Sequence, residues 1–474
     1  MATSTAIPST NDYRRFRAAI IAEEEQHSLG KDLILNADEK SCNEKLLAMK
    51  RRELYGPSDR QPWQRNFLRS AGIIEASSVF QFIKKLPKGA SLHSHLYASA
   101  SYKYVVNDLL YRDDIYVCNI DGRIKLKFLA KTDVNSGCES LADKRNSVDF
   151  DDWLDAHLLV KDSDNIEDVW NGFRKIFTFT YDLFSYVDVL EDYIHRVLLE
   201  HYLDNVMYVE VRTPFVPMYD LKNTTYDPED FVSKLWDIVN KFKRKYPDFV
   251  GMKIIYAPYR ASNVAIVKEN FKILKRIAGK YPGFIAGIDL VGFEEEGTLL
   301  HYLDELQSIG EHLPFYFHAG ETNRHGAFVD HNILDAILLG SKRIGHALAL
   351  PKHPSLMRMV KEKNIAVEVC PISNQMLGFV SDLRNHPATY LISRGYPVVV
   401  CNDDPGNWGA EGLSYDWYLA FMAMSGENAG LELLKKLAMN SIEYSALDDA
   451  QKALALKIWT DKWNQFISDF TNEI

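Results

Sequence analysis

From residue 89 onward, short apolar runs alternate with longer segments whose apolar residues recur at helical spacing. Eight of these runs have the length of a buried β-strand: residues 90–96, 206–212, 250–256, 284–291, 314–318, 343–348, 365–369 and 397–401. Helix candidates between them include residues 229–244, 265–280, 329–339, 354–363 and 382–394. This alternation predicts an α/β fold, a (β/α)8 TIM-type barrel. The alternative is a doubly wound open sheet, but no GxGxxG follows the first expected strand.

Two additions to a plain barrel are expected. Residues 11–86 are charge-rich with apolar residues at helical spacing, so we predict an N-terminal helical region, residues 1–86. Residues 87–474 would form the barrel domain, which ends in helices at 410–472. About 110 residues separate the first two expected strands, far more than a barrel loop needs. This connection holds an insertion at about residues 108–150, with a hairpin at 115–128, followed by helices at 149–200. At the C-terminal face of the barrel it would be a lid, a substrate wall or a partner-binding module.

The net charge of the chain limits the kinds of molecule that it can bind non-specifically. The chain has 55 basic and 65 acidic residues, a net charge of −10, which argues against non-specific binding to nucleic acid or an anionic membrane. No apolar stretch is long enough to span a bilayer. Met1 to Thr10 lack the basic and apolar regions of a secretory signal. A mature form whose signal was removed would also begin this way, so the compartment stays open.

The five cysteines form no CxxC pair, which argues against a structural zinc knuckle. Cys118 and Cys138 flank a polar, turn-rich segment. Their spacing is compatible with a disulfide and equally with two free thiols in a reducing compartment.

Polar residues that bind metal ions or move protons close four of the expected strands. The segments are Leu92-His93-Ser94-His95, Phe317-His318-Ala319-Gly320-Glu321, Gly345-His346 and Asn402-Asp403-Asp404-Pro405. His93 and His95 are two apart on a strand and therefore face the same side. In a closed barrel the first and last strands are neighbours, so we expect His93, His95 and His318 to lie close to Asp403. Three imidazoles and one carboxylate form a site suited to Zn²⁺.

The remaining polar residues at these strand ends suit catalysis. Glu321 can shuttle a proton if a partly dry pocket raises its pKa. His346 can orient or deprotonate a metal-bound water, and Asp404 can accept a hydrogen bond from a substrate N–H. Each residue alone also has an ordinary explanation, as a hydrogen-bonded core histidine, a surface glutamate or a turn aspartate. Their common place at strand ends favours the functional interpretation.

Specific sequence blocks then carry a family resemblance over nearly the whole chain. They are "LPKGASLHSH", "NVMYVEVR", "KIIYAPYR", "AGIDLVGFE", "YFHAGETN", "KRIGHALALPKHP", "VEVCPISNQ", "SDLRNHP" and "CNDDPGNWGAEGLSYDWY". With these blocks in this order, the chain resembles the adenosine deaminase family of the amidohydrolase superfamily. It is most similar to the adenosine deaminase-related growth factors, the subfamily that includes the extracellular adenosine deaminases.

The resemblance implies a hydrolase that acts on a C–N bond of a cyclic amidine. Adenosine or 2′-deoxyadenosine would be converted to inosine or 2′-deoxyinosine, with release of ammonia. One Zn²⁺ per chain would be bound by His93, His95, His318 and Asp403. Glu321 would protonate the ring nitrogen beside the reacting carbon, and His346 and Asp403 would hold the attacking hydroxide.

The same resemblance implies substrate contacts and further structure. Asp404 and the backbone of Gly292 would hold other ring nitrogens, Trp170 would lie near the ribose, and Asp149 is a weaker candidate for a sugar contact. In the subfamily an N-terminal helical region forms a homodimer and a disulfide-bearing insertion follows the first strand. Residues 11–86 and the segment between Cys118 and Cys138 resemble these, which favours the disulfide. Most members are secreted, and Asn223-Thr224-Thr225 matches a glycosylation sequon.

The chain departs from the family where the sugar would be read. After the paired histidines, members usually have an aspartate that binds the sugar hydroxyl, whereas this chain has Leu96 and Tyr97. Tyr259 stands where a charged or imidazole side chain is usual, and Ala347 replaces a glycine. A missing hydrogen-bond partner can cost a substrate orders of magnitude in rate. We therefore expect altered sugar specificity, a sugar read through Tyr97 or Tyr259, or another adenine compound such as AMP or a modified adenosine as the substrate.

Two other classes of function compete with this hypothesis. A growth-factor-like binding protein with weak activity would keep the fold, but retention of every metal and proton-transfer residue argues against it. A two-metal hydrolase of a phosphoester or amide normally has a bridging carboxylated lysine or an extra carboxylate. No lysine ends the fourth expected strand, which closes with Asp289-Leu290-Val291-Gly292. Zinc deaminases of the cytidine class are excluded, because HxE with PCxxC is absent.

Overall fold

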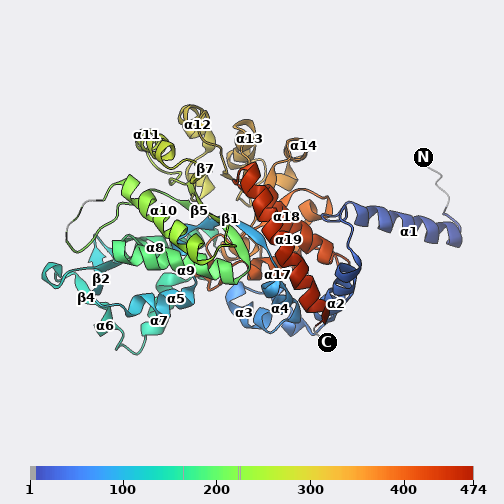
Figure 1. Ribbon diagram of the computed structural model, residues 1–474, viewed down its shortest axis with the longest axis horizontal. Helices are drawn as coiled ribbons and strands as arrows, with labels where there is room; N and C mark the ends of the chain where they lie inside the picture. Colours follow the sequence, from blue (N-terminus) through green and yellow to red (C-terminus); the bar gives the residue numbers. More distant parts are fainter. Residues whose placement is uncertain (1–6, 164, 223, 225, 473–474) are drawn as a thin grey trace.

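Eight parallel β-strands form the centre of the computed structural model, which describes residues 7–163, 165–222, 224 and 226–472 (Figure 1). They make two four-stranded sheets, with the strand orders β1-β5-β6-β7 and β11-β10-β9-β8. Backbone bridges join the sheets at both edges, where Ser94 pairs with Asp403 and Ile288 pairs with Phe315. The sheets therefore close into the (β/α)8 barrel that the sequence predicts.

Each barrel strand lies at an expected position, although several are shorter than expected. They are β1 (Gly89–His95), β5 (Val206–Thr213), β6 (Gly251–Tyr256), β7 (Ile285–Ile288), β8 (His318–Ala319), β9 (Arg343–His346), β10 (Ala366–Val369) and β11 (Val398–Val400). Strand β8 has only two residues. The residues before it run along the seam between the two sheets, where Ile288 bonds to Pro314 and Tyr316.

Charged side chains are buried inside the barrel on strands that are otherwise apolar. Glu210 and Arg212 are two residues apart on β5 and therefore share a face. Arg343 on β9 bonds to Glu210 at 2.5 Å and to Glu368 on β10 at 2.6 Å. The barrel interior is thus an ion-pair network beneath the strand ends.

Helices cover the outside of the barrel (Figure 1). The crossover helices are α10 (Pro228–Lys245), α11 (Val264–Lys280), α12 (Leu303–Gly310), α13 (His331–Leu338), α14 (Pro354–Glu362) and α16 (Ala388–Ser393). In α10, Asp227 caps the first turn, Pro228 begins the helix, and apolar residues such as Leu235 form a buried stripe. The helix expected at residues 382–394 is split, because His386 is held extended by the proline that follows it.

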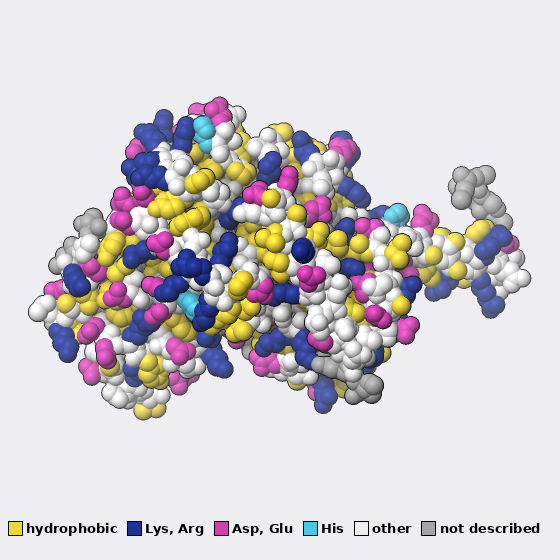
Figure 2. Space-filling view, in the orientation of Figure 1, with side chains coloured by type: hydrophobic (Ala, Val, Ile, Leu, Met, Phe, Trp, Pro, Cys, Tyr) yellow, Lys and Arg dark blue, Asp and Glu magenta, His cyan; other side chains and the backbone are white. Residues whose placement is uncertain are grey.

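Helices from both ends of the chain pack on the barrel. The N-terminal helices are α1 (Thr10–Gln26), α2 (Ala37–Leu54), α3 (Phe67–Glu75) and α4 (Ser78–Lys85). Helix α2 packs against α18 (Leu431–Glu443) and α19 (Asp449–Asn472), while α4 packs against α17 (Ser414–Ala423). Helix α1 projects from the body and buries none of its residues (Figures 1 and 2). Among the described helices, none combines the length and the apolar character needed to cross a bilayer.

The connection after β1 contains a small antiparallel sheet of β2 (Ile115–Ile120), β3 (Arg123–Phe128) and β4 (Cys138–Ser140). Asp121 and Gly122 both have positive φ angles at the expected hairpin turn. Cys118 and Cys138 are paired across β2 and β4 and form a disulfide. The helices α7 (Phe150–Leu158), α8 (Ile166–Phe184) and α9 (Val187–Leu203) follow, and β3 packs on α8. Asn223 and Thr225 of the predicted sequon lie outside the described residues.

Candidate active site

The four residues predicted to bind zinc lie together at the C-terminal ends of the strands. His93 and His95 come from β1, His318 from β8, and Asp403 follows β11 across the seam from Ser94. One ligand atom from each residue lies within 4.8 Å of the others. Nε2 of His93 and Nε2 of His95 are 3.2 and 3.0 Å from Oδ1 of Asp403.

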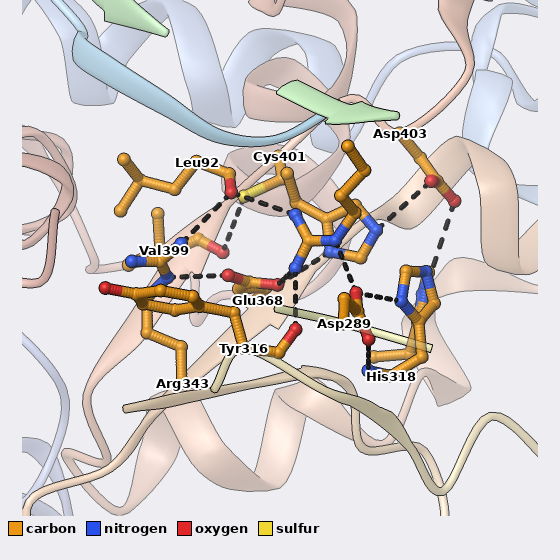
Figure 3. A network of polar contacts seen from close by, with 12 residues as sticks. Leu92, Asp289, Tyr316, His318, Arg343, Glu368, Val399, Cys401 and Asp403 are labelled. Carbon is orange, nitrogen blue, oxygen red and sulfur yellow. Dashed lines mark hydrogen bonds and ion pairs between the residues drawn. The ribbon is translucent and has the colours of Figure 1, made fainter. Parts of the chain in front are cut away.

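Buried carboxylates orient two of these imidazoles. Nδ1 of His93 lies 2.7 Å from Oε2 of Glu368, and Nδ1 of His318 lies 2.6 Å from Oδ2 of Asp289 (Figure 3). Arg212 donates to both carboxylates, each at 2.7 Å. Burial alone would raise the pKa of Glu368 and of Asp289, but Arg212, with Arg343 beside Glu368 and His318 beside Asp289, holds both well below the usual range.

Because the carboxylates stay ionised, each accepts a hydrogen bond from the Nδ1–H of its histidine. The lone pairs on Nε2 of His93 and His318 are then free to bind a metal. Nε2 of His93 and Oδ1 of Asp403 are buried and have no hydrogen-bond partner among the described residues. Unsatisfied buried polar atoms are costly and call for a ligand. Three imidazole nitrogens and one carboxylate oxygen fit a tetrahedral Zn²⁺.

A chain of hydrogen bonds determines the tautomer of His346. The backbone N–H of Ala388 donates to Nδ1 of His386 at 3.0 Å, so the proton of that neutral ring is on Nε2. Nε2 of His386 then donates to Oδ1 of Asn374 at 2.9 Å, and the Asn374 amide donates to Nδ1 of His346 at 3.0 Å. Burial lowers the pKa of His386 to about 3 and that of His346 well below its usual value. His346 is therefore neutral, with a proton on Nε2, which lies 3.8 Å from Oδ2 of Asp403.

Glu321 is a buried carboxyl group beside this chain. Its Oε1 lies 3.6 Å from Nδ1 of His346 and has no hydrogen-bond partner among the described residues. Burial, the charge of Asp403 and that of Glu294 raise its pKa well above the usual value. The turn before it needs Gly320, whose φ is +81° and where a Cβ would lie 2.5 Å from Ile333. The raised pKa favours the protonated form of Glu321, the form that can donate a proton.

These residues form the inner end of a cavity of about 700 Å³. Gly292 lies on its wall with a φ of +105°, and a Cβ there would lie 2.3 Å from the Tyr259 ring, so only glycine fits. Asp404 is buried at the inner end, and burial together with the charge of Asp403 raises its pKa well above the usual value.

Three of the residues predicted to contact the sugar line the cavity, and each has a different neighbour. Trp170 is buried and lines the cavity with its ring 5.0 Å from that of Phe293. Tyr97 also lines the cavity and stacks on Phe184. The hydroxyl of Tyr259, on the cavity wall, already bonds to Glu296.

Three further residues offer no side-chain hydrogen bond to a sugar in the cavity. Asp149 does not line the cavity; it is exposed and precedes α7. Leu96 and Ala347 are buried beside the site, and Leu96 lines the cavity without a polar group. Neither position offers the sugar a hydrogen bond from its side chain.

Some residues of the site were not singled out from the sequence. Arg212, Asp289, Arg343 and Glu368 support the histidines, and Asn374 and His386 support His346. For Arg212 the signal is a charge at every second position of an apolar strand, as in "YVEVR", since that spacing directs charges into the barrel. The cavity wall also includes Arg123, Arg174 and Lys175.

Comparison with known proteins agrees with this geometry. A family model described as "Adenosine deaminase" matches residues 141–460, and one described as "Adenosine/AMP deaminase N-terminal" matches residues 2–83. The chain belongs to the adenosine deaminase family. It is 38% identical to adenosine deaminase 2 of Homo sapiens, over 96% of this chain and 93% of that protein. It is 37% identical to adenosine deaminase of Lutzomyia longipalpis, over 97% and 94%.

Solved structures share the fold of this deaminase. The structure of arabidopsis ADAL complexed with GMP has a TM-score of 0.59 at 21% identity, covering 80% of this chain and 98% of that chain. An amidohydrolase from Burkhoderia ambifaria, solved with bound Zn, has a TM-score of 0.59 at 16% identity, covering 83% and 95%. The family resemblance is confirmed, and the deaminase is a hydrolytic enzyme of a family whose members generally depend on a metal.

Proposed function

We propose that this deaminase replaces the 6-amino group of adenosine or 2′-deoxyadenosine with oxygen and releases ammonia. The proposal rests chiefly on one observation: a buried Glu321, whose pKa is raised by that burial, stands beside a donor set of three histidines and one aspartate. Relatives that cover nearly the whole chain are named adenosine deaminase, which supports the same substrate.

We propose that one Zn²⁺ per chain is held by His93, His95, His318 and Asp403. A bound Zn²⁺ would make a coordinated water acidic enough to lose its proton near neutral pH. The orphaned Nε2 of His93 and Oδ1 of Asp403 support this assignment. The carboxylates behind the histidines would keep the ligand nitrogens in place.

The other residues would act on the purine. The neutral ring offers three nitrogens as hydrogen-bond acceptors on its edges, so the site must supply donors. Protonated Glu321 would donate to the nitrogen beside the reacting carbon, protonated Asp404 to a second, and the backbone N–H of Gly292 to a third. The Nε2–H of His346 would hold the incoming oxygen. The water oxygen then bonds to C6 as a hydroxyl, and the C6–N bond breaks as the hydroxyl proton passes to the amino group, which leaves as ammonia. The other proton of the water replaces the one that Glu321 gave to the ring.

The test is ammonia release from adenosine, 2′-deoxyadenosine and adenine by zinc-loaded protein, with zinc content measured in parallel. Glu321→Gln should lower kcat by about 10²- to 10⁴-fold, because amide nitrogen cannot supply the proton. It should leave zinc content unchanged. Glu295→Gln, at a partly exposed glutamate paired with Arg324, is the matched control and should keep full activity. Unchanged kcat in the Glu321 variant, or no ammonia from any substrate, would reject the proposal.

We also propose that residues 1–86 form a helical unit that makes a homodimer. Tyr13, Phe16 and Ile20 lie on one side of α1 and are 50–59% exposed. This apolar stripe is visible on the projecting helix in Figure 2. Helix α1 buries none of its residues against the described part of the chain, so its apolar side chains are free to meet a partner surface.

A further inference from the structure

The outer part of the catalytic cavity is built by the insertion rather than by barrel strands. Asn171, Arg174, Lys175 and Thr178 line it from one face of α8, at the i, i+3, i+4 and i+7 spacing of a helix. Arg123 lines it from the first residue of β3, directly after the hairpin turn. The mouth of the cavity is therefore formed by β3 and α8 of the insertion, whereas its inner end is formed by residues at the ends of barrel strands.

Two positive charges at this mouth have no partner. Arg174 is paired with Glu296, and neighbouring acidic groups are also occupied, because Asp182 pairs with Lys125 and Glu295 with Arg324. Arg123 and Lys175 are exposed, and neither side chain makes a hydrogen bond or ion pair to any residue that the structure describes. In a chain of net charge −10, such a pair concentrates positive potential at one place.

No carboxylate among the described residues opposes a negative ligand between the mouth and the inner end. The acidic residues that line the cavity are Glu321, Asp403 and Asp404, all of them buried at the inner end. Leu96, which follows His95, also lines the cavity. The carboxylates that line the cavity are therefore confined to its buried inner end, whereas its exposed lining includes Arg123 and Lys175.

We propose that Arg123 and Lys175 form a phosphate subsite, so that the enzyme takes adenosine monophosphates as substrates. The inference rests on the proposed deaminase function, because the adenine must occupy the inner end for its phosphate to reach the mouth. Guanidinium and ammonium groups are the side chains that bind phosphate best in proteins. The same groups would do little for an uncharged nucleoside.

The test compares kcat/KM for adenosine, 5′-AMP and 3′-AMP at fixed low ionic strength. One of the two nucleotides should be deaminated at least about tenfold more efficiently than adenosine, and this advantage should shrink as salt is added. Arg123→Gln and Lys175→Gln should each lower the efficiency on that nucleotide about tenfold. Neither variant should change the efficiency on adenosine.

Lys127→Gln is the matched control, since Lys127 lies on the same strand but over the ring of Tyr219 rather than in the cavity. It should change neither activity. Efficient deamination of adenosine, with neither nucleotide deaminated or inhibiting competitively, would overturn the phosphate subsite and leave the deaminase function standing. Nucleotide turnover that both variants leave intact would also overturn the subsite. Failure to deaminate any of the three compounds would instead reject the proposed function.

Discussion

At the scale of single residues, the barrel interior contains buried charged side chains where apolar side chains would be usual. Arg212 reaches the carboxylates behind His93 and His318, and all of these side chains are buried. Buried ion pairs add little net stability, because desolvation offsets their attraction. Their value here is orientation, since each Nδ1 is held by a carboxylate that Arg212 keeps ionised.

The chain that ends at His346 makes a prediction about its tautomer. In Asn374→Asp, a carboxylate would face Nδ1 of His346 and accept a hydrogen bond from it, so the ring proton would move from Nε2 to Nδ1. We expect kcat to fall about 10- to 100-fold with zinc content unchanged. The ring nitrogen shifts of His346 in NMR should report the changed tautomer. Asn385→Asp, at an exposed asparagine nearby, should behave as wild type, and a wild-type tautomer in Asn374→Asp would contradict the assignment.

The pKa of His386 predicts a stability effect in acid. Burial lowers this pKa to about 3, from about 6.5 in the unfolded chain, so between these values only the unfolded chain takes up the proton. The stabilisation is therefore complete above about pH 6.5 and is lost as the pH falls toward 3, by up to about 1.4 kcal/mol per pH unit. Urea unfolding of wild type and His386→Gln at pH 7.5, 6 and 5 measures this, and their free energies should converge in acid. Parallel curves would show that His386 does not titrate on unfolding.

At the scale of elements, the insertion shapes the site through a short hairpin. Strand β3 packs on α8, and the two together bring Arg123 and Lys175 to the cavity mouth. The sheet has only three short strands, so it depends on this packing and on the disulfide between β2 and β4.

Removing the disulfide should loosen the insertion. The double change Cys118→Ser and Cys138→Ser opens a loop of 20 residues, which costs about 3 kcal/mol in the chain-entropy estimate. We expect faster proteolysis between residues 119 and 137 and a lower melting temperature. Ser140→Ala, on the same strand β4, is the control and should be cleaved at the wild-type rate. Equal cleavage of the double variant would show that packing on α8 alone holds the hairpin.

At the scale of the whole molecule, helices from the N-terminal and C-terminal parts of the chain pack against one another on the barrel. Helix α2 packs on α18 and α19, and α18 lies against β1 and β11, where the barrel closes. The N-terminal helices are thus tied to the barrel, whereas α1 extends away from it (Figure 1).

The dimer proposal predicts the mass in solution. The full chain of 54.3 kDa should sediment at twice this mass, and Phe16→Asp or Ile20→Asp should shift it to the monomer, because a charge in the stripe cannot be desolvated. Analytical ultracentrifugation at several concentrations measures the equilibrium. Arg14→Ala, off the stripe on α1, should remain dimeric. A monomeric full chain, or dimers in both aspartate variants, would contradict the role of α1.

Much of this protein could be predicted from the order of its residues. Strand and helix patterns are local, so the alternation of apolar runs was enough to predict the barrel. The clustering of the four residues that we propose as zinc ligands could be predicted for the same reason, because each closes a strand and parallel strands end on one face. The disulfide was less certain, since two cysteines flanking a turn-rich segment suit a bond or two thiols equally.

Side chains that act at a distance in sequence were decided only by tertiary structure. Arg212 binds Glu368 156 positions away, and His386 reaches His346 through Asn374, contacts that depend on how strands and loops are stacked. The burial that raises the pKa of Glu321 exists only once the cavity walls close around it. Likewise the sequence alone shows that Leu96 follows His95, where family members usually have an aspartate nearby. Only the packing of β3 on α8 places Arg123 at the cavity mouth.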